Sequence, residues 1–472
     1  MSKLVLDEVL SAIDHSIEYS DGKVTIKDEK GLRAKAYRLA EISALDGGEK
    51  AGWARYITRL AAAALGTYPA SINELYMARG AGKVPNTFTV PAINLRVMAF
   101  DCARAVFRAA GKINAGAIIF EIARSEMTYT DQRPSEFTTS VLAAALAENF
   151  TGPIFLQGDH FQVSPKKYAA DPAAELEALR TLIREAVAGG YLNIDVDTST
   201  LVDLSKTTIP EQQEVNTELS AMLTAYIRSM EPAGVAISVG GEIGEVGGHN
   251  STEEELRAYL DGFKAKLSKL GNLTGLSKIS IQTGTSHGGV VLPDGSIAQV
   301  SVDFDTMLKL SRISRKDYGL GGAVQHGAST LPENAFGKFV EAEACEIHLA
   351  TNFANIFFDL IPDDLRKQMY AFLDQKNAAD RKPDMTDEQF YYKTRKNAIG
   401  TFKKQSWRLP AETKEIIFNA WEEQFTKLFH LLALKDTRGF VKDCIKHPVV
   451  QPKLSDFLGD AASDDNAGDL AD

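Results

Sequence analysis

Short apolar segments alternate with longer amphipathic segments between about residue 88 and residue 350. The apolar segments have the length of β-strands, and most segments between them repeat apolar residues at helical spacing. Eight apolar segments occur in order: Phe88–Leu95, Ala115–Ala123, Pro153–Gln157, Tyr191–Val196, Val235–Val239, Lys278–Gln282, Gly322–Gln325 and Cys345–Leu349. Eight strands separated by helices predict an α/β fold, a closed parallel (β/α)₈ TIM barrel.

An open, doubly wound sheet is the competing arrangement for such a pattern. It would place a glycine-rich dinucleotide-binding turn directly after the first strand. The segment Val90–Met98 contains no such turn. The repeating region, residues 85–360, is also close in length to the ~250 residues of a typical barrel. The sequence therefore favours the closed barrel.

Both ends of the chain have a different pattern. Residues 1–84 predict a helical N-terminal extension, with a small hairpin at Tyr19–Asp28, and residues 361–453 predict a helical C-terminal extension. Residues 454–472 carry six aspartates and no basic residue. This last segment predicts a disordered, solvated tail, with an acidic interaction tail as the alternative.

The composition narrows the function classes. Of 472 residues, 44% are hydrophobic and 24% are charged, as in ordinary globular proteins with a large core. No apolar run approaches the roughly 20 residues of a membrane helix, which argues against a membrane protein. The net charge of −11 argues against nucleic acid as a partner. Three scattered cysteines and a start without a signal-peptide pattern predict a cytoplasmic protein without a disulfide framework or a cysteine zinc site.

Polar residues with ligand chemistry follow most of the predicted strands, where a parallel barrel carries its active site. Four of the eight histidines fall there, at His160, His287, His326 and His348, and Glu242 follows the fifth strand. Three converging imidazoles with one open position are typical of a catalytic zinc site, and they also suit cobalt. A structural network is the alternative for the histidines. Glu242 is either a further ligand or a residue that orients a histidine.

Asp159 directly precedes His160 at the end of the third predicted strand. Adjacent strand residues face opposite sides of a sheet, so both reach one site only where the strand ends and turns. There Asp159 could act as general acid or base on a metal-bound substrate, with a cap on the following segment as the alternative. Two other predicted strands also carry carboxylates, at Glu121 and Asp195.

Glycine-containing turns follow the sixth and seventh predicted strands, at His287-Gly-Gly289 and His326-Gly-Ala-Ser329. Such turns after late barrel strands expose backbone N–H groups to a phosphate. The segment His348–Asn352 would complete the cradle. Together these turns favour a phosphorylated substrate.

Six short motifs in fixed order resemble those of the class II, metal-dependent ketose-bisphosphate aldolases. The resemblance covers about residues 85–360. The motifs are Val90-Pro-Ala-Ile-Asn94, Gly158-Asp-His160, Gly241-Glu-Ile-Gly-Glu-Val-Gly-Gly248, Gly284-Thr-Ser-His-Gly288 with Val302-Asp-Phe-Asp305, His326-Gly-Ala-Ser329 with Leu331-Pro332, and Ile347-His-Leu-Ala-Thr351.

The resemblance implies metal ligands at His160, His287 and His326. It implies that Asp159 is the acid/base at the C3–C4 bond of the sugar, and it makes Glu253 a candidate for the carboxylate that handles the C1 proton. The implied metal is zinc, with cobalt or manganese as alternatives, and a monovalent cation is a further expected cofactor. The family usually has Asn or Asp where this chain has His348.

The resemblance also implies a substrate site. Asn94 matches a substrate-side position, and four residues match phosphate-binding positions: Gly288, Gly327, Ser329 and Thr351. A basic group should hold the second phosphate, and the C-terminal extension offers four candidates: Arg395, Lys403, Lys404 and Arg408.

The expected activity is reversible aldol cleavage of fructose or tagatose 1,6-bisphosphate to dihydroxyacetone phosphate and an aldehyde phosphate, a step of carbohydrate metabolism such as glycolysis. The resemblance further implies a homo-oligomer, a dimer or a tetramer. Two alternatives remain: a metal-dependent ketose epimerase, and a non-catalytic subunit that stabilises an aldolase. The presence of Asp159 and the strand-end histidines argues against the subunit, because binding alone needs none of them.

Overall fold

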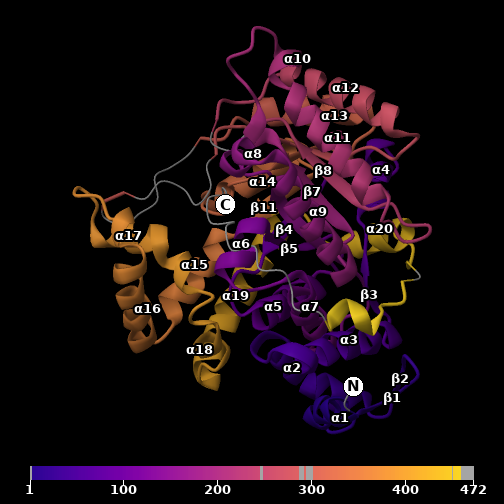
Figure 1. Cartoon of the computed structure of the whole chain (residues 1–472), viewed down its shortest axis with the longest axis vertical. Helices are drawn as coiled ribbons and strands as arrows, with labels where there is room; N and C mark the ends of the chain where they lie inside the picture. The colour runs from indigo at the N-terminus through magenta and orange to yellow at the C-terminus, as the bar shows by residue number, and fades with distance from the viewer. Residues whose placement is uncertain (1–2, 245–247, 286–291, 294–300, 449, 459–472) are drawn as a thin grey trace.

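The computed structural model describes residues 3–244, 248–285, 292–293, 301–448 and 450–458. Eight strands form a closed parallel barrel at the centre of the molecule (Figure 1). They are β4 (Val90–Asn94), β5 (Ile119–Ala123), β6 (Gly152–Gln162), β7 (Asn193–Asp197), β8 (Ser238–Glu242), β9 (Lys278–Ile281), β10 (Ala323–Gln325) and β11 (Glu346–Leu349). Each pairs with the next, and β11 pairs with β4. The predicted TIM barrel is confirmed.

Strand β8 differs most from its predicted position. The apolar pattern placed a strand at Val235–Val239, whereas β8 begins at Ser238 and runs through two glycines to Glu242. A Cβ on Gly240 would collide with the carboxylate of Asp195, and one on Gly241 with the hydroxyl of Tyr259. The glycines are therefore required by close packing on both faces of β8, although glycine alone is a poor strand former.

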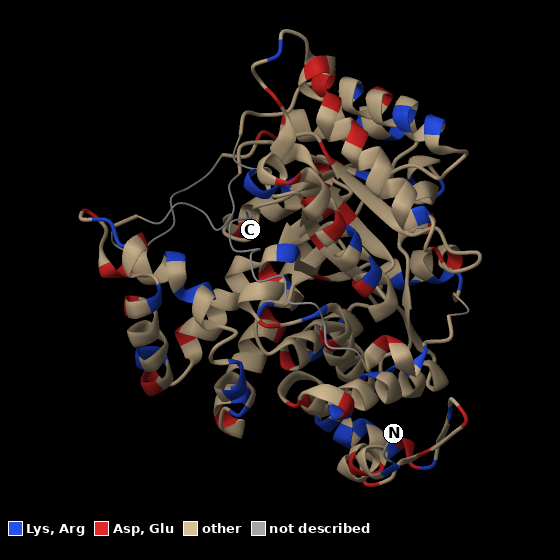
Figure 2. Ribbon diagram, in the orientation of Figure 1, with Lys and Arg blue, Asp and Glu red and all other residues tan. Residues whose placement is uncertain are grey.

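Helices surround the barrel and bury its outer face. Their bounds are α5 (Ala99–Lys112), α6 (Arg124–Tyr129), α7 (Pro134–Ala147), α8 (Pro165–Ala170), α9 (Pro172–Gly189), α10 (Ile209–Gln212), α11 (Glu214–Arg228), α12 (Glu253–Leu270), α13 (Phe304–Tyr318), α14 (Glu333–Glu341) and α15 (Thr351–Leu360), with a 3₁₀ turn η1 (Ser199–Leu201). Charged residues of both signs are spread over these outer helices (Figure 2).

The N-terminal segment comprises α1 (Lys3–Ala12), β1 (Ile17–Ser20), β2 (Lys23–Ile26), α2 (Glu29–Leu45), α3 (Gly48–Ala64), β3 (Thr67–Ala70) and α4 (Asn73–Gly80). The helices α1 to α3 of this segment lie at the bottom of Figure 1, where α2 and α3 pack against α7, whereas α4 lies at the right beside α13 and α20 (Thr437–Cys444). The predicted hairpin is confirmed, with Ile17 opposite Ile26. Strand β3 pairs in parallel with β6, so the segment joins the sheet of the barrel as well as its helices.

The C-terminal segment is helical and reaches around the barrel, from α16 to α18 at the left of Figure 1 to α20 at the right, beside α4. It comprises α16 (Asp363–Lys376), η2 (Ala378–Asp380), α17 (Asp387–Thr394), η3 (Arg395–Ala398), α18 (Lys403–Trp407), α19 (Ala411–Leu431), α20 (Thr437–Cys444) and η4 (Leu454–Phe457). The buried Phe457 packs on Tyr56 of α3. Packed chain thus extends four residues into the predicted tail, and residues 459–472 lie outside the described part.

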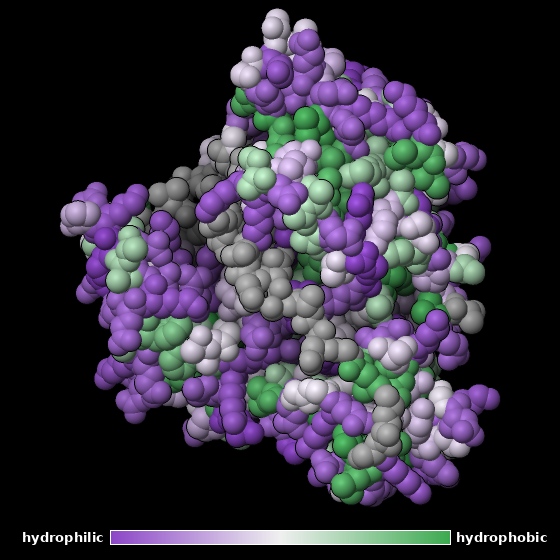
Figure 3. All heavy atoms as spheres, viewed as in Figure 1, coloured by the Kyte–Doolittle hydropathy of each residue, from purple (hydrophilic) through white to green (hydrophobic). Residues whose placement is uncertain are grey.

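The surface view shows a mostly hydrophilic face on which hydrophobic patches lie apart from one another (Figure 3). Among the residues that the structure describes, no helix combines the length and the apolar character needed to cross a bilayer.

Candidate functional site

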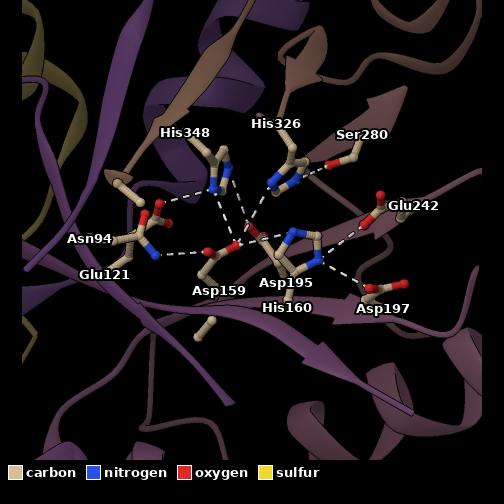
Figure 4. A network of polar contacts seen from close by, with 12 residues as sticks. Asn94, Glu121, Asp159, His160, Asp195, Asp197, Glu242, Ser280, His326 and His348 are labelled. Atoms are coloured by element: carbon tan, nitrogen blue, oxygen red, sulfur yellow. Dashed lines mark hydrogen bonds and ion pairs between the residues drawn. The ribbon is translucent and has the colours of Figure 1, made fainter. Parts of the chain in front are cut away.

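The site begins with an irregularity in β6. The pairing of β6 with β7 shifts register between Gly158 and Phe161, and His160 has a left-handed backbone with φ of 40°. A bulge of this kind re-aims side chains because it breaks the strict alternation of faces. Asp159 and His160 consequently point into the same cluster (Figure 4). The sequence predicted that the strand would end and turn at Asp159 and His160. Instead β6 continues to Gln162, and the bulge within it changes the direction of the two side chains.

One metal-binding arrangement joins three barrel strands. His160 from β6, Glu242 from β8 and His326 after β10 are buried, and each offers a ligand atom within 4.8 Å of the other two. His160 Nδ1 lies 3.0 Å from Asp197 Oδ2, and His326 Nε2 lies 3.0 Å from Ser280 Oγ. Contacts of this kind fix the orientation of a ligating imidazole. Buried imidazole and carboxylate donors fit a divalent transition metal.

His287, the third implied histidine ligand, lies outside the described residues, as does Gly288. The structure therefore brings together two of the three predicted histidines and Glu242.

A fourth histidine extends this cluster across the barrel. The His326 ring lies 4.2 Å from that of His160 and 3.9 Å from that of His348, measured between centroids. His348 Nδ1 is 2.9 Å from Glu121 Oε1 and 3.2 Å from Asp159 Oδ1. Asp159 thus lies between the three imidazoles, with His160 Nε2 and His326 Nδ1 each 3.9 Å from its Oδ1 atom.

A buried lysine lies beside the cluster inside the barrel. Lys278 Nζ contacts Asp195 at 2.9 Å, Glu346 at 2.5 Å and the side-chain oxygen of Gln157 at 2.8 Å. Tyr76 of α4 donates a hydrogen bond to the other oxygen of Glu346. Lys278 and Glu346 were not identified from the sequence, although a charged residue inside a predicted apolar strand is a signal of such a network.

The pKa values of these groups reflect an excess of buried acid. Burial opposes the ionised form of Asp159, but the charges of the neighbouring imidazoles outweigh it and hold its pKa well below the usual range. Burial lowers the pKa of His160, but Asp159 and Glu242 raise it more strongly, to about 10. Burial, and then the charge of Asp159, raise the pKa of Glu121 to about 8. Protons therefore neutralise the cluster where no other cation does, and a bound metal ion would replace them.

Asp159 is held by a series of polar contacts that begins at Asn94, the last residue of β4. Asn94 donates hydrogen bonds to Asp159 Oδ2 at 2.9 Å and to Glu126 Oε2 at 2.8 Å. Glu126 in turn forms a buried ion pair with Arg96. Asn94 thus lies beside Asp159, and its amide orients one oxygen of that carboxylate.

The three predicted phosphate positions that the structure describes lie at the same end of the barrel. Gly327 has a left-handed φ of 67°, Ser329 Oγ accepts a hydrogen bond from the backbone N–H of Ala350, and Thr351 is the first residue of α15. Arg96 lies beside this group, with Nη1 3.4 Å from Thr351 Oγ1.

A second cation reaches the site from the C-terminal segment. Burial and the positive charge of Arg96 lower the pKa of Lys396 to about 8, and its Nζ lies 5.4 Å from the centroid of the Tyr129 ring. Two adjacent cations raise each other's energy, and a bound anion would relieve that repulsion. Neither residue was identified from the sequence, because they meet only through the packing of η3 against the barrel.

The four basic residues predicted from the sequence to hold the second phosphate have different surroundings. Lys403 bonds to Glu136 and to the backbone of Asp131, and Arg395 bonds to Asn355 while covering the ring of Tyr392. Lys404 and Arg408 are exposed on and after α18.

Glu253, the candidate for the C1 proton, begins α12. It pairs with Arg257 at 2.9 Å and Lys309 at 3.0 Å on the surface.

Known proteins resemble this chain in sequence and in fold. The family model for fructose-bisphosphate aldolase class-II matches residues 83–407. No curated protein matches the sequence significantly. Two similar solved structures are a fructose-bisphosphate aldolase from Campylobacter jejuni (17% identity, 79% of this chain and 97% of that chain, TM-score 0.44) and a protein described as a probable tagatose 6-phosphate kinase from Sinorhizobium meliloti (16% identity, 78% and 97%, TM-score 0.48).

Proposed function

Because the chain belongs to the class II fructose-bisphosphate aldolase family, we propose that it catalyses metal-dependent, reversible aldol cleavage of a ketose bisphosphate. The observation that carries this proposal is the bulge in β6, which directs Asp159 and His160 to one point at the carboxyl end of the barrel. A carboxylate next to a metal-binding imidazole is the arrangement that such a cleavage requires.

His160, Glu242 and His326 would hold a divalent metal ion, most simply zinc, together with His287. Once bound, the ion would supply a Lewis acid that polarises the ketose carbonyl and stabilises the enediolate left after cleavage. Asp197 and Ser280 keep the two described imidazoles in the required orientation.

Asp159 is the proposed proton carrier. In cleavage its carboxylate removes the proton of the C4 hydroxyl while the C3–C4 bond breaks, and in condensation it returns that proton. Asn94 fixes Oδ2, so Oδ1 is the oxygen directed into the site.

The two phosphates are proposed to bind at the rim of the barrel. Gly327, Ser329 and the start of α15 at Thr351, with Gly288 as implied by the resemblance, would form one phosphate cradle, and Arg96 contacts Thr351 there. Lys396 is the proposed partner of the second phosphate, since it is a cation close to the site. Binding at two ends places the C3–C4 bond over Asp159 and lowers the entropic cost of reaction.

Asp159→Ala tests the proposal. The variant should retain the metal ion at His160 and His326 and lose about 10²–10⁴-fold in rate, the usual contribution of a placed proton carrier. The values of kcat and kcat/KM should fall together, in both directions of the reaction. If Asp159 were only a cap, the change would cost about 0.5–2 kcal/mol of stability and leave turnover per folded molecule intact.

Product analysis decides the reaction class. Fructose and tagatose 1,6-bisphosphates are each incubated with the metal-loaded protein, and triose phosphates, isomeric ketoses and unchanged substrate are quantified. Triose formation supports the proposal. An isomeric ketose without triose identifies an epimerase, and no conversion of either sugar favours a non-catalytic subunit; both results contradict it.

A further inference from the structure

A second set of metal-binding groups lies beside the first. Glu121, Asp159, Asp195 and His348 are buried, and each offers a ligand atom within 4.8 Å of the others. They come from β5, β6, β7 and β11, so the set spans the barrel on the side away from Glu242 (Figure 4). His326 belongs to a third set, with Asp159 and His348, that joins the two.

The hydrogen bonding of these carboxylates leaves one oxygen of each directed into the set. Gln157 donates to Glu121 Oε2 at 2.7 Å, and Asn94 donates to Asp159 Oδ2. Within the described part of the chain, Glu121 Oε1, Asp159 Oδ1 and both ring nitrogens of His348 form no aligned hydrogen bond, although all are buried. They approach one another as charged groups: His348 Nδ1 lies 2.9 Å from Glu121 Oε1 and 3.2 Å from Asp159 Oδ1, and its Nε2 lies 2.7 Å from Glu346 Oε1. Converging, unaligned donor atoms are what a cation between them would require.

Charge gives a second, independent reason. Six buried carboxylates surround the cluster: Glu121, Asp159, Asp195, Asp197, Glu242 and Glu346. Among the described residues, Lys278 is the one lysine or arginine that pairs with any of them, and it is engaged with Asp195 and Glu346. A single divalent ion and Lys278 would carry three positive charges against six negative ones. Buried carboxylates in such excess must be protonated or must bind a further cation.

We propose that the barrel holds a second divalent cation, bound by Glu121 Oε1 and His348 Nδ1, so that the centre is dinuclear. Asp159 Oδ1 faces both positions and stays unligated as the proton carrier of the proposed function. Asp195 is paired with Lys278 and is not counted among the ligands. The inference extends the metal centre of the proposed function and rests on it for the first ion.

His348 is a position at which this chain differs from the family that it resembles. The corresponding position usually carries Asn or Asp, whereas an imidazole is a preferred ligand of zinc and related transition-metal ions. His348→Asn is therefore a substitution of similar shape that removes the ligand. A protonated His348 with no second ion is the competing explanation, and it predicts one ion for the natural chain and for the variant.

The test is a titration of the metal-free, untagged full-length protein with CoCl₂, followed by the visible absorption of bound Co²⁺. The natural chain should saturate at two equivalents. His348→Asn and Glu121→Gln should each saturate at one, while His160→Ala should lose the other equivalent and keep the second site. His430→Asn, which removes an exposed imidazole on α19, is the matched control and should still bind two.

The outcomes separate this inference from the proposed function. One equivalent in the natural chain, unchanged in His348→Asn, overturns the second site and leaves the first. No binding in the natural chain contradicts both. Melting temperatures of the metal-free forms identify any variant that fails to fold, and Glu121→Gln then carries the test in place of His348→Asn. Exchange coupling between two Mn²⁺ ions in electron paramagnetic resonance should be present in the natural chain and absent in both variants.

Discussion

Two buried polar networks at the carboxyl end of the barrel contrast in charge. In one, Arg124 at the start of α6 pairs with Glu175 of α9 at 2.6 Å, and both side chains are 1% exposed. Arg124 also donates to the carbonyl of Gln162, and Glu175 accepts the backbone N–H of Ser164. The positive charge of Arg124 is therefore balanced by the negative charge of Glu175, and backbone groups satisfy further hydrogen bonds of both side chains.

The other network is the cluster of histidines and carboxylates, where acid exceeds base and several donor atoms converge without hydrogen bonds. A balanced buried pair can be stable by itself, whereas an unbalanced one needs protons or metal ions from solution. The difference teaches that burial of charge does not identify a functional site, but uncompensated burial of charge does. Five predictions test this contrast.

The largest effect is expected from metal removal. A chelator should abolish activity, and zinc, cobalt or manganese should restore it, because the unbalanced cluster depends on a cation. His326→Ala should lose metal content in elemental analysis and yet keep a folded barrel by circular dichroism, since its side chain lies at a strand end outside the packed layers. Full activity of the metal-free protein would contradict the metal assignment.

Breaking the balanced pair should affect stability instead of chemistry. Arg124→Met leaves Glu175 buried without its partner and should cost about 3–5 kcal/mol in the free energy of unfolding. The double variant Arg124→Met/Glu175→Leu removes both charges and should recover most of that loss. Denaturant unfolding measures both, and activity per folded molecule should stay near normal. A selective loss of turnover in the double variant would assign this pair to the site.

The pair of cations at the rim gives a pH-dependent prediction. Since the pKa of Lys396 is lowered to about 8, its positive charge is present at neutral pH and is lost as pH rises through 8. The KM of the natural chain for a bisphosphate should therefore rise above pH 8. Lys396→Met should raise KM about tenfold at pH 7, a loss of ~1.4 kcal/mol, with a smaller ratio between the two proteins at pH 9. A constant ratio would remove Lys396 from phosphate binding.

Stability should change with the opposite sign at this position. A lysine whose pKa is lower in the folded chain than in the unfolded chain destabilises the fold below the folded value, and the cost disappears as pH rises toward the unfolded value of ~10.4. Lys396→Met should therefore have the higher melting temperature at pH 7, and the difference should shrink between pH 8 and pH 10.

The smallest effect is expected at a helix cap in the balanced region. Asp171 caps α9, the helix of Glu175, by accepting a hydrogen bond from the backbone N–H of Ala174. Asp171→Ala should cost about 1 kcal/mol of stability, measured by chemical denaturation, and should leave turnover and metal content unchanged. Any change in metal content would show that the two networks are coupled through α9.

Much of the fold was predictable because it depends on local pattern. Each strand of a parallel barrel is buried on both faces, so its apolar run is visible in the sequence, and seven of the eight runs overlap their strands closely. The two glycines of β8 did not fit this apolar pattern. They are required by close packing and do not favour a strand by themselves. Strand ends also marked His160, His326 and Glu242 as a group, since parallel strands end on one side of the sheet.

The sequence by itself thus determined the order of the strands, the end of the barrel that carries chemistry, and the residues able to bind a metal. Only the tertiary structure decided which of them meet. The bulge that turns both Asp159 and His160 inward exists because β6 pairs with β7 out of step. Lys278 and Glu346, 68 residues apart, find each other only through strand order and stagger. A buried strand or helix is visible in the sequence as a periodic pattern of apolar residues. A contact between distant polar residues depends on closure of the barrel and produces no such pattern.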